Sequence, residues 1–300
     1  MTTEQESRQG ILLAIAAYTM WGIAPIYFKA ISQVPALEIL SHRVIWSFIL
    51  LAVLLHIGRR WRSARDICRS KSKMLLLITT ALLVGVNWLI YIWAVNSNHM
   101  LDASLGYYIN PLLNVMLGLV FLGERLRKMQ WFAVALATCG VAIQVIIFGS
   151  IPIVAIALAL TFGFYGLLRK KVKIDAQTGL FIETLVMLPA AAIYLLWIAD
   201  SATSDPSLNT ATLNMLLICA GIVTTLPLLC FTGAATRLKL STLGFFQYIG
   251  PSLMFLLAVL VYGESFTIDK AITFAFIWSA LVIFSYDGLK AKKHSGKPKS

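Results

Sequence analysis

Residues 104–124 of the chain read SLGYYINPLLNVMLGLVFLGE, and residues 242–264 read TLGFFQYIGPSLMFLLAVLVYGE. Both stretches begin with a hydroxyl residue, Leu-Gly and two aromatic residues, and both continue through a proline and an apolar run to Gly-Glu. The second stretch has two additional residues, Gln247 and Tyr248, before its proline. Chance similarity of apolar composition does not explain this shared order, so we interpret the two stretches as an internal repeat.

The composition indicates a membrane protein. Of the 300 residues, 59% are apolar and only 13% are charged, whereas about 25% of the residues in a soluble domain are charged. This composition excludes a soluble globular enzyme and a disordered chain. Four cysteines in a chain of this length also exclude a disulfide scaffold.

The apolar residues fall in ten windows, each close to the length of about 20 residues that a helix needs to cross a bilayer. Backbone groups in lipid must be hydrogen-bonded within the protein, and the windows lack strict alternation, so we expect helices and not barrel strands. The predicted fold class is an all-α membrane protein with ten transmembrane helices. The windows are residues 11–31, 37–57, 74–95, 103–123, 129–148, 151–168, 178–199, 212–235, 241–263 and 269–288.

The repeat divides the chain into two halves of five spans, residues 11–149 and 150–289, followed by a basic tail, residues 290–300. Because five is odd, the second half is expected to enter the membrane from the opposite side. Two inverted halves can open a central cavity to either side in turn, as in many secondary transporters. Glu124 and Glu264 are then expected at opposite faces, as anchors at the ends of their spans.

The basic residues follow the same alternation. All but three of the 25 lie in the two tails or in the even-numbered loops, the three being Lys29, Arg43 and Lys270. Cytoplasmic loops carry an excess of Lys and Arg, so we predict a bacterial inner-membrane protein with both termini in the cytoplasm. The net charge of +12 is thereby explained without a nucleic-acid partner.

The ten windows, the two halves and the Pro-to-Gly-Glu endings resemble the EamA branch of the drug/metabolite transporter superfamily. Trp21-Gly22, Ser41-His42-Arg43 and residues 105–111 resemble most closely its RarD permeases, which are linked by name to chloramphenicol sensitivity. The resemblance covers residues 10–290, although Thr161-Phe162-Gly163 lacks the Trp-Gly of the first half. It implies a non-enzymatic exporter whose spans one, three, four, six, eight and nine surround a central path.

Arg43 is a basic residue well inside a predicted span. Charged residues in membrane spans usually face the bundle interior or a water-filled cavity. The guanidinium group suits a carboxylate, so Arg43 is a candidate for a substrate or gating contact. The alternatives are that it extends to the membrane surface or pairs with Glu38 of its own helix.

Glu183 is the acidic residue that lies most clearly within a span. A buried carboxylate can carry a proton and couple transport to the proton gradient. The alternative is a Glu at the membrane surface that pairs with the basic run Arg169–Lys173.

Aromatic and amide side chains at helical spacing predict a binding surface for an organic molecule. Each of them has an alternative role in the interfacial aromatic belt or in hydrogen bonds between helices. These further candidate substrate-binding residues are Tyr18, Trp21, Trp88, Tyr91, Tyr107, Asn110, Asn114, Tyr165, Gln247 and Tyr248.

The sequence has no phosphate-binding loop and no catalytic signature, and its His and Cys residues lack metal-ligand spacing. We therefore expect no cofactor and no metal. The expected partners are a small-molecule substrate, the lipid bilayer and protons if transport is proton-coupled, with the protein as a monomer or a homodimer. A membrane enzyme acting on lipid-linked substrates and a channel or receptor without active transport are the alternatives.

Overall fold

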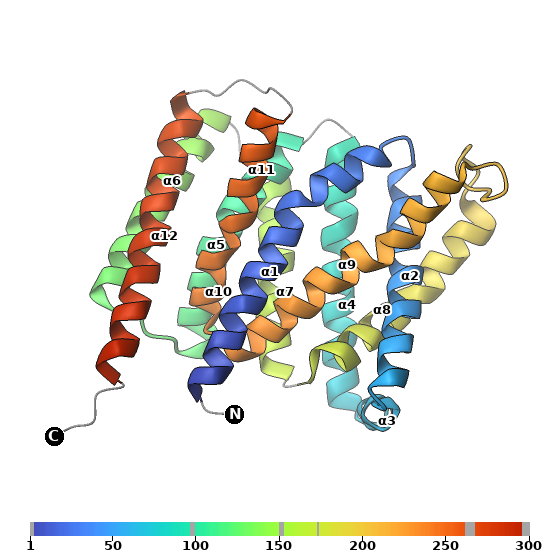
Figure 1. Ribbon diagram of the computed structural model, residues 1–300, viewed down its shortest axis with the longest axis horizontal. Helices are drawn as coiled ribbons and strands as arrows, with labels where there is room; N and C mark the ends of the chain where they lie inside the picture. Colours follow the sequence, from blue (N-terminus) through green and yellow to red (C-terminus); the bar gives the residue numbers. More distant parts are fainter. Residues whose placement is uncertain (1–2, 97–99, 150–152, 173, 262–267, 296–300) are drawn as a thin grey trace.

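The computed structural model describes residues 3–96, 100–149, 153–172, 174–261 and 268–295. Within these ranges it contains helices and no strand, which confirms the all-helical class (Figure 1). The helices are α1 (Thr3–Ala30), α2 (Ala36–Ile57), α3 (Trp61–Arg69), α4 (Lys71–Asn96), α5 (Met100–Leu122), α6 (Lys128–Phe148), α7 (Ile153–Val172), α8 (Ala176–Ile193), the π-helical turn η1 (Tyr194–Ile198), α9 (Ala211–Arg237), α10 (Leu240–Gln247), α11 (Ile249–Leu260) and α12 (Ile268–Ser295).

Nine helical segments in the described part of the chain are long and apolar enough to cross a membrane. They coincide with nine of the ten predicted windows. The predicted window 241–263 differs, because its described residues form two shorter helices, α10 and α11, that meet at Tyr248. Ten uninterrupted transmembrane helices are therefore not confirmed.

Two backbone features mark the break between α10 and α11, although Pro111 at the matching place of the first copy lies within the continuous helix α5. Pro251 has no backbone N–H, so the carbonyl of Gln247 lacks the donor that a continuous helix would supply. The N–H of Tyr248 bonds to the carbonyl of Phe245 at 3.3 Å, three residues back, which tightens the last turn of α10. Gln247 and Tyr248, the two residues that distinguish the second copy of the repeat, thus lie at the break.

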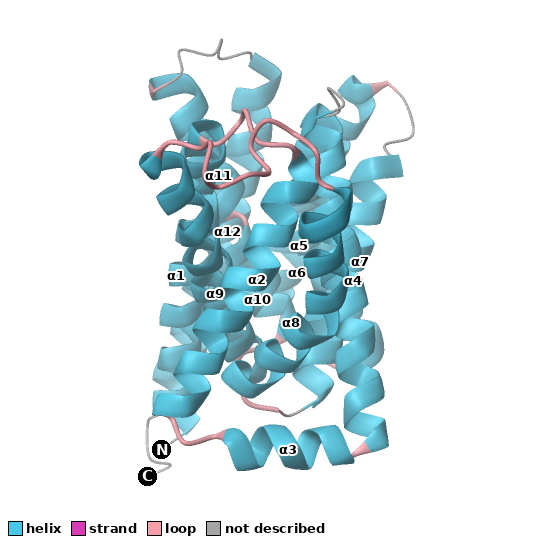
Figure 2. Ribbon diagram, turned by 90° about the vertical axis from the view of Figure 1, so that its right-hand side faces the viewer, coloured by secondary structure: helices cyan, strands magenta, loops and turns pink. Residues whose placement is uncertain are grey.

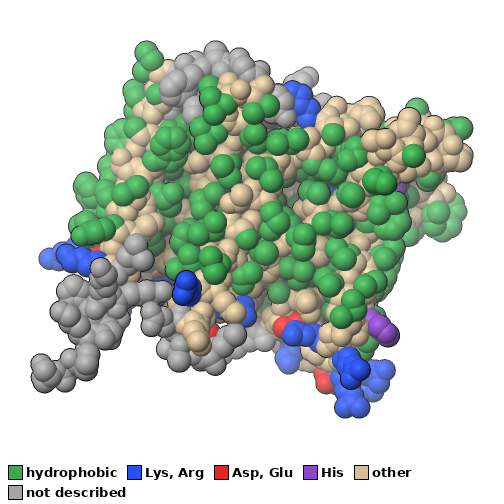
Figure 3. Space-filling view, in the orientation of Figure 1, with side chains coloured by type: hydrophobic (Ala, Val, Ile, Leu, Met, Phe, Trp, Pro, Cys, Tyr) green, Lys and Arg blue, Asp and Glu red, His purple; other side chains and the backbone are tan. Residues whose placement is uncertain are grey.

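The two ends of the bundle differ in charge. The start of α1 and the end of α12 lie at the same end, beside α3 (Figure 1). On the face shown in Figure 3, most Lys and Arg side chains gather there. We call this the basic end. Helix α3, which was expected to be a loop, lies across this end of the bundle (Figure 2).

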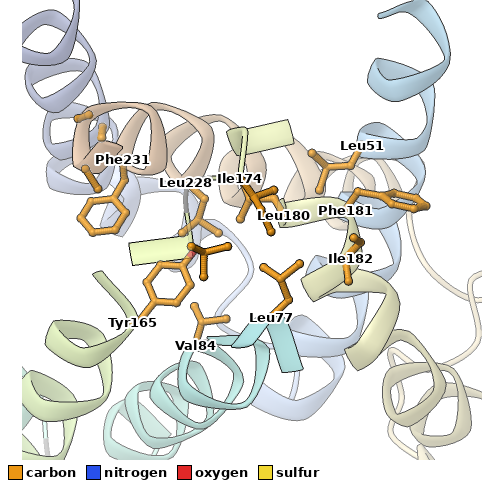
Figure 4. Packing of buried hydrophobic residues seen from close by; sticks show 14 of the residues in the cluster. Leu51, Leu77, Val84, Tyr165, Ile174, Leu180, Phe181, Ile182, Leu228 and Phe231 are labelled. Atoms are coloured by element: carbon orange, nitrogen blue, oxygen red, sulfur yellow. The ribbon is translucent and has the colours of Figure 1, made fainter. Parts of the chain in front are cut away.

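The main apolar core lies between α2, α4, α7, α8 and α9. Figure 4 shows Leu51, Leu77, Tyr165, Ile182 and Phe231 converging from these five helices. Helices α6 and α12 pack on each other beside this core, and their buried residues form a second cluster with Phe245 and Tyr248. These two clusters of buried side chains form the interior of the bundle around the candidate site.

Helices α2 and α9 approach closely at Gly221. A Cβ atom at this position would lie 2.5 Å from the carbonyl carbon of Trp46 and 2.7 Å from its oxygen. The Ser47 hydroxyl also donates to the Gly221 carbonyl at 3.3 Å. Close backbone approach of this kind is how small residues bring membrane helices together.

We predict that Gly221→Ala will destabilise the protein by about 1–3 kcal/mol, since the backbone of α2 must move to admit the methyl group. Gly288→Ala is the matched control, because a Cβ at Gly288 meets nothing within 4 Å. Thermal unfolding of the detergent-purified variants measures the difference. Equal melting temperatures for the two variants would contradict the close contact.

The Gly-Glu ending of the first repeat copy has a structural role. Gly123 adopts a positive φ of 61° after α5, a conformation that glycine reaches without strain. Glu124 then turns inward and accepts hydrogen bonds from the backbone N–H groups of Leu240 and Ser241 at 2.6 and 3.0 Å. Glu124 thus lies just after the end of its span, and its carboxylate has the additional role of capping α10. Glu264 lies outside the described residues.

Glu124→Ala should lower the free energy of unfolding by about 0.5–2 kcal/mol, the usual loss when a helix N-cap is removed. Glu124→Gln keeps one acceptor oxygen and should lose less. Thermal unfolding in detergent is the measurement. A Gln variant as unstable as the Ala variant would show that charge, and not hydrogen bonding, is what matters at this position.

Asp175 links the start of α8 to Arg60, the residue that precedes α3 at the basic end. Its carboxylate accepts a hydrogen bond from the Thr178 N–H at 3.0 Å and pairs with Arg60 at 2.9 Å. Burial alone would raise the pKa of Asp175, but the hydrogen bonds from Thr178 and the charge of Arg60 hold it below its usual value. The carboxylate thus stays ionised as the N-cap of α8.

Candidate functional site

A cavity of about 110 Å³ lies inside the bundle, between α1, α2, α4, α5, α7 and the α10–α11 break. This volume holds several water molecules. The wall is mainly aromatic and aliphatic, with a few polar groups, as in most sites for small organic molecules. Eighteen residues line it: Tyr18, Trp21, Ala24, Pro25, Phe28, Arg43, Asn87, Trp88, Tyr91, Gly106, Tyr107, Asn110, Leu158, Phe162, Gln247, Gly250, Pro251 and Met254.

Most of the predicted substrate-binding residues are brought together on this wall. The lining includes Tyr18, Trp21, Arg43, Trp88, Tyr91, Tyr107, Asn110 and Gln247. Asn114, Tyr165 and Tyr248 are not part of it. Each of these three is buried and bonds to another residue instead.

Arg43 lies on the cavity wall with 8% of its surface exposed. Its Nε donates to the Thr224 hydroxyl at 2.8 Å, and its guanidinium carbon lies 4.5 Å from the centre of the Trp88 ring. The Phe28 ring is also close, at 5.5 Å. The side chain therefore does not extend to the membrane surface, and its contacts fix the guanidinium at the cavity.

Glu38 does not neutralise Arg43. The carboxylate of Glu38 accepts a hydrogen bond from the Thr203 hydroxyl at 2.7 Å, in the connection between η1 and α9. Among the described residues, no Asp or Glu forms an ion pair with Arg43. The alternative of pairing with Glu38 within the helix is thus not what the structure contains.

An aromatic cluster lies at one side of the cavity, where its members Tyr18, Trp21 and Phe162 belong to the lining. Phe231 of α9 lies at its centre, with Phe162, Trp21 and Tyr165 at ring distances of 5.0, 5.7 and 6.0 Å. Tyr18 contacts the same ring at 6.3 Å. Rings from α1, α7 and α9 thereby meet at one place, so a movement of any of these helices reshapes the cavity.

Two of the lining residues each have a buried oxygen atom without a hydrogen-bond partner in the structure, the Tyr18 hydroxyl and the Asn110 side-chain carbonyl oxygen. Both residues are buried. One turn further along α5, Asn114 donates to the Gln247 side chain at 2.9 Å and thus joins α5 to α10. Buried polar atoms without partners are unusual, and a ligand in the cavity could satisfy them.

Glu183 is only 1% exposed and belongs to a buried polar cluster outside the cavity. It accepts a hydrogen bond from the Thr80 hydroxyl at 2.6 Å and one from Tyr165 at 3.3 Å. The Arg169 guanidinium lies 3.5 Å away and is equally buried. The predicted partner Arg169 is therefore correct, but the pair lies in the interior and not at the membrane surface.

Glu183 and the cavity occupy different depths of the bundle. Arg43, Tyr107 and Phe162 lie in the first halves of α2, α5 and α7, which begin at the end opposite the basic end. Glu183 lies in the first half of α8, which begins at the basic end. A small space of about 10 Å³, lined by Trp88, Thr224 and Glu183, separates the two regions.

Comparison with known proteins identifies the family. The model of the EamA-like transporter family matches residues 8–146 and, a second time, residues 149–286. The chain belongs to the EamA-like transporter family. In this EamA-family chain the first match ends at residue 146 and the second begins at residue 149.

The EamA-family chain has bacterial relatives over nearly its whole length, some of them named transporters and others named RarD. A protein named "Uncharacterized transporter" in Vibrio cholerae serotype O1 is 77% identical over 288 residues, covering 96% of this chain and 95% of the relative. "Protein RarD" of Escherichia coli strain K12 is 60% identical over 293 residues, covering 98% and 99%. A solved crystal structure shares the fold, with a TM-score of 0.72 at 18% identity, covering 92% of this chain and 97% of that one. The predicted likeness to EamA transporters close to RarD is thereby confirmed, and the protein is a multi-pass bacterial membrane transporter.

Sequence reasoning did not single out Phe28 or Thr224, and it did not predict the buried position of Arg169, in this EamA-family protein. Phe28 continues the helical spacing of Tyr18, Trp21 and Pro25, so that spacing could have revealed it. Thr224, which holds Arg43, carries no signal in an apolar window. Arg169 was assigned to a basic loop, because it stands next to Lys170 and Lys171.

Proposed function

We propose that the protein is a secondary active transporter that exports small organic metabolites or drugs across the bacterial inner membrane, with both termini in the cytoplasm. The observation that carries this proposal is the cavity lined by six helical regions, with one fixed cation and many aromatic side chains. Chloramphenicol-like compounds are one candidate group of substrates, following the RarD resemblance. A membrane enzyme is disfavoured, because the lining has no acid or histidine for catalysis.

We propose alternating access as the mechanism, with the two five-helix halves related by inversion. The cavity lies toward one end of the bundle, whereas the buried Arg169–Glu183 pair and the aromatic cluster close the route toward the basic end. Rocking of one half against the other would separate these groups and open the cavity on the other side. A channel would need polar stripes along several helices, which this mainly apolar wall lacks.

Counterflow in proteoliposomes tests this proposal. Vesicles that contain the purified protein and a high internal concentration of an unlabelled substrate should accumulate the labelled substrate transiently. A channel gives no such exchange, and a receptor or an enzyme gives binding or conversion without counterflow. Binding of a compound without counterflow would overturn the transporter assignment.

The proposed coupling ion is the proton, carried on Glu183. A proton on this carboxylate would remove its attraction for Arg169 and loosen α7 from α8, because a buried cation that loses its partner is destabilised. Proton binding would thereby favour opening toward the basic end. The small space that separates Glu183 from the cavity supports this proposal, since its wall includes both Glu183 and Thr224, the hydrogen-bond partner of Arg43.

Glu183→Gln should make the transport rate independent of pH, because the amide can neither gain nor lose a proton in this range. The measurement is uptake into proteoliposomes across a series of pH gradients. Glu38→Gln is the matched control, since Glu38 is equally buried but pairs with Thr203 away from the cavity. An unchanged pH profile in the Glu183 variant would indicate uniport or another coupling ion.

A further inference from the structure

The cavity carries a positive charge that no other group on its wall neutralises. Arg43 is the one charged side chain among the eighteen lining residues. Of the two nearby buried acids, Glu38 bonds to Thr203 and Glu183 lies beside Arg169. A buried charge without a partner is unfavourable, so the protein interior is most stable when an anion enters the cavity.

The contacts of Arg43 hold its guanidinium group in place without neutralising its positive charge. Nε is occupied by the Thr224 hydroxyl, and the rings of Trp88 and Phe28 lie against the guanidinium. Within the described chain, no hydrogen bond or ion pair engages the two terminal nitrogens. Two parallel N–H donors on a fixed plane match the two oxygens of a carboxylate.

The unpartnered polar atoms provide a second and independent indication of a ligand. The Tyr18 hydroxyl and the Asn110 carbonyl oxygen are buried, belong to residues that line the cavity and have no hydrogen-bond partner in the structure. They suit a hydroxyl or an amide on the ligand. An ammonium group fits less well, because the wall has no carboxylate to neutralise it.

We propose that the cavity selects organic monoanions that carry a carboxylate, a neutral polar group and an aromatic or branched aliphatic body. Arg43 binds the carboxylate, Asn110 and Tyr18 bind the polar group, and Trp21, Phe28 and Phe162 surround the body. Uncharged compounds and zwitterionic amino acids bind more weakly. This assignment rests on the proposed transport function, whose central cavity it uses, but it concerns recognition and is tested by binding alone.

Three compounds that share the same aromatic side group distinguish the binding of a monoanion, an uncharged compound and a zwitterion. Phenyllactate has a carboxylate and a hydroxyl group, phenyllactamide lacks the charge, and phenylalanine replaces the hydroxyl with an ammonium group. Binding to the full-length purified protein can be followed by tryptophan fluorescence, since Trp21 and Trp88 line the cavity. We expect phenyllactate to bind at least about tenfold more tightly than either analogue, the change that 1.4 kcal/mol produces.

Variants of the protein test which residues cause the preference for the carboxylate compound. Arg43→Gln should bind phenyllactate and phenyllactamide equally, whereas Arg60→Gln, an exposed site paired with Asp175, should keep the wild-type preference. Asn110→Asp places an acid on the wall and should shift the preference toward phenylalanine. Equal binding of phenyllactate and phenyllactamide by the wild-type protein, or no binding of phenyllactate at millimolar concentration, overturns the proposal without any variant.

The binding test and the transport test fail separately. Phenyllactate that binds through Arg43 but shows no counterflow supports anion recognition and contradicts the transporter. Counterflow of uncharged compounds that Arg43→Gln leaves unchanged supports the transporter and contradicts anion recognition.

Discussion

Arg43→Ala should reduce transport to the background level while the protein still inserts in the membrane. The substitution removes the charged group of the cavity wall and leaves Thr224 and Trp88 without their shared partner. Truncating one member of a buried, hydrogen-bonded charge pair loses about 2–5 kcal/mol of binding free energy. A loss of 2 kcal/mol already weakens binding roughly thirtyfold. Uptake into proteoliposomes at matched protein density measures the effect.

Arg43→Lys separates charge from geometry. Lysine keeps the positive charge but has no planar group to lie on Trp88 and to bond Thr224 at the same time. We therefore expect transport between those of the wild type and the alanine variant. Size-exclusion profiles in detergent verify that each variant is folded. Normal uptake by a folded Arg43→Ala protein would show that Arg43 is not needed for substrate binding or transport.

Arg169→Met should destabilise the protein by about 3–5 kcal/mol, the usual effect of breaking a buried ion pair. Glu183 would then be buried without a cation beside it, with only the hydroxyl groups of Thr80 and Tyr165 as partners, and would have to stay charged at a cost or take up a proton. The guanidinium also packs directly against Gly179, so its removal leaves a gap beside α8. Thermal or denaturant unfolding of the purified variant measures the loss.

The double variant Arg169→Met/Glu183→Gln is the decisive comparison. It removes both charges and should recover much of the lost stability, since an uncharged pair is often as stable as a buried ion pair. The coupling between the two substitutions is then large. Losses that simply add would show that Arg169 and Glu183 contribute independently and that the contact at 3.5 Å is not an effective ion pair.

Helical spacing predicted which face of a helix the candidate residues occupy, but it did not predict how far along the helix each of them lies relative to the cavity. Tyr107, Asn110 and Asn114 share one face of α5, but only the first two reach the cavity, because Asn114 lies one turn nearer the basic end and bonds to Gln247. Tyr165 likewise lies beyond Phe162, next to Glu183. A period of 3.6 residues fixes which way a side chain faces and leaves open where along the helix the cavity ends.

The interior position of Arg169 could not be predicted from its own segment. Arg169, Lys170 and Lys171 form a basic run of the kind that ends a membrane span. In the structure, the lack of a side chain at Gly179 makes room for the Arg169 guanidinium, and Lys170 donates to the carbonyls of Ala235 and Leu238. These partners lie on α8 and at the end of α9, so they depend on tertiary packing that a local pattern does not contain.

The lone charge of Arg43 has an electrical consequence. With a monoanionic substrate, the loaded cavity is close to neutral, whereas without substrate it holds one positive charge within the bilayer. Moving one elementary charge through the full membrane potential changes the free energy by about 2.3 kcal/mol per 100 mV. In the proposed alternating-access cycle with a monoanionic substrate, voltage would therefore act chiefly on the return of the unloaded carrier and would set how soon it is ready for the next molecule.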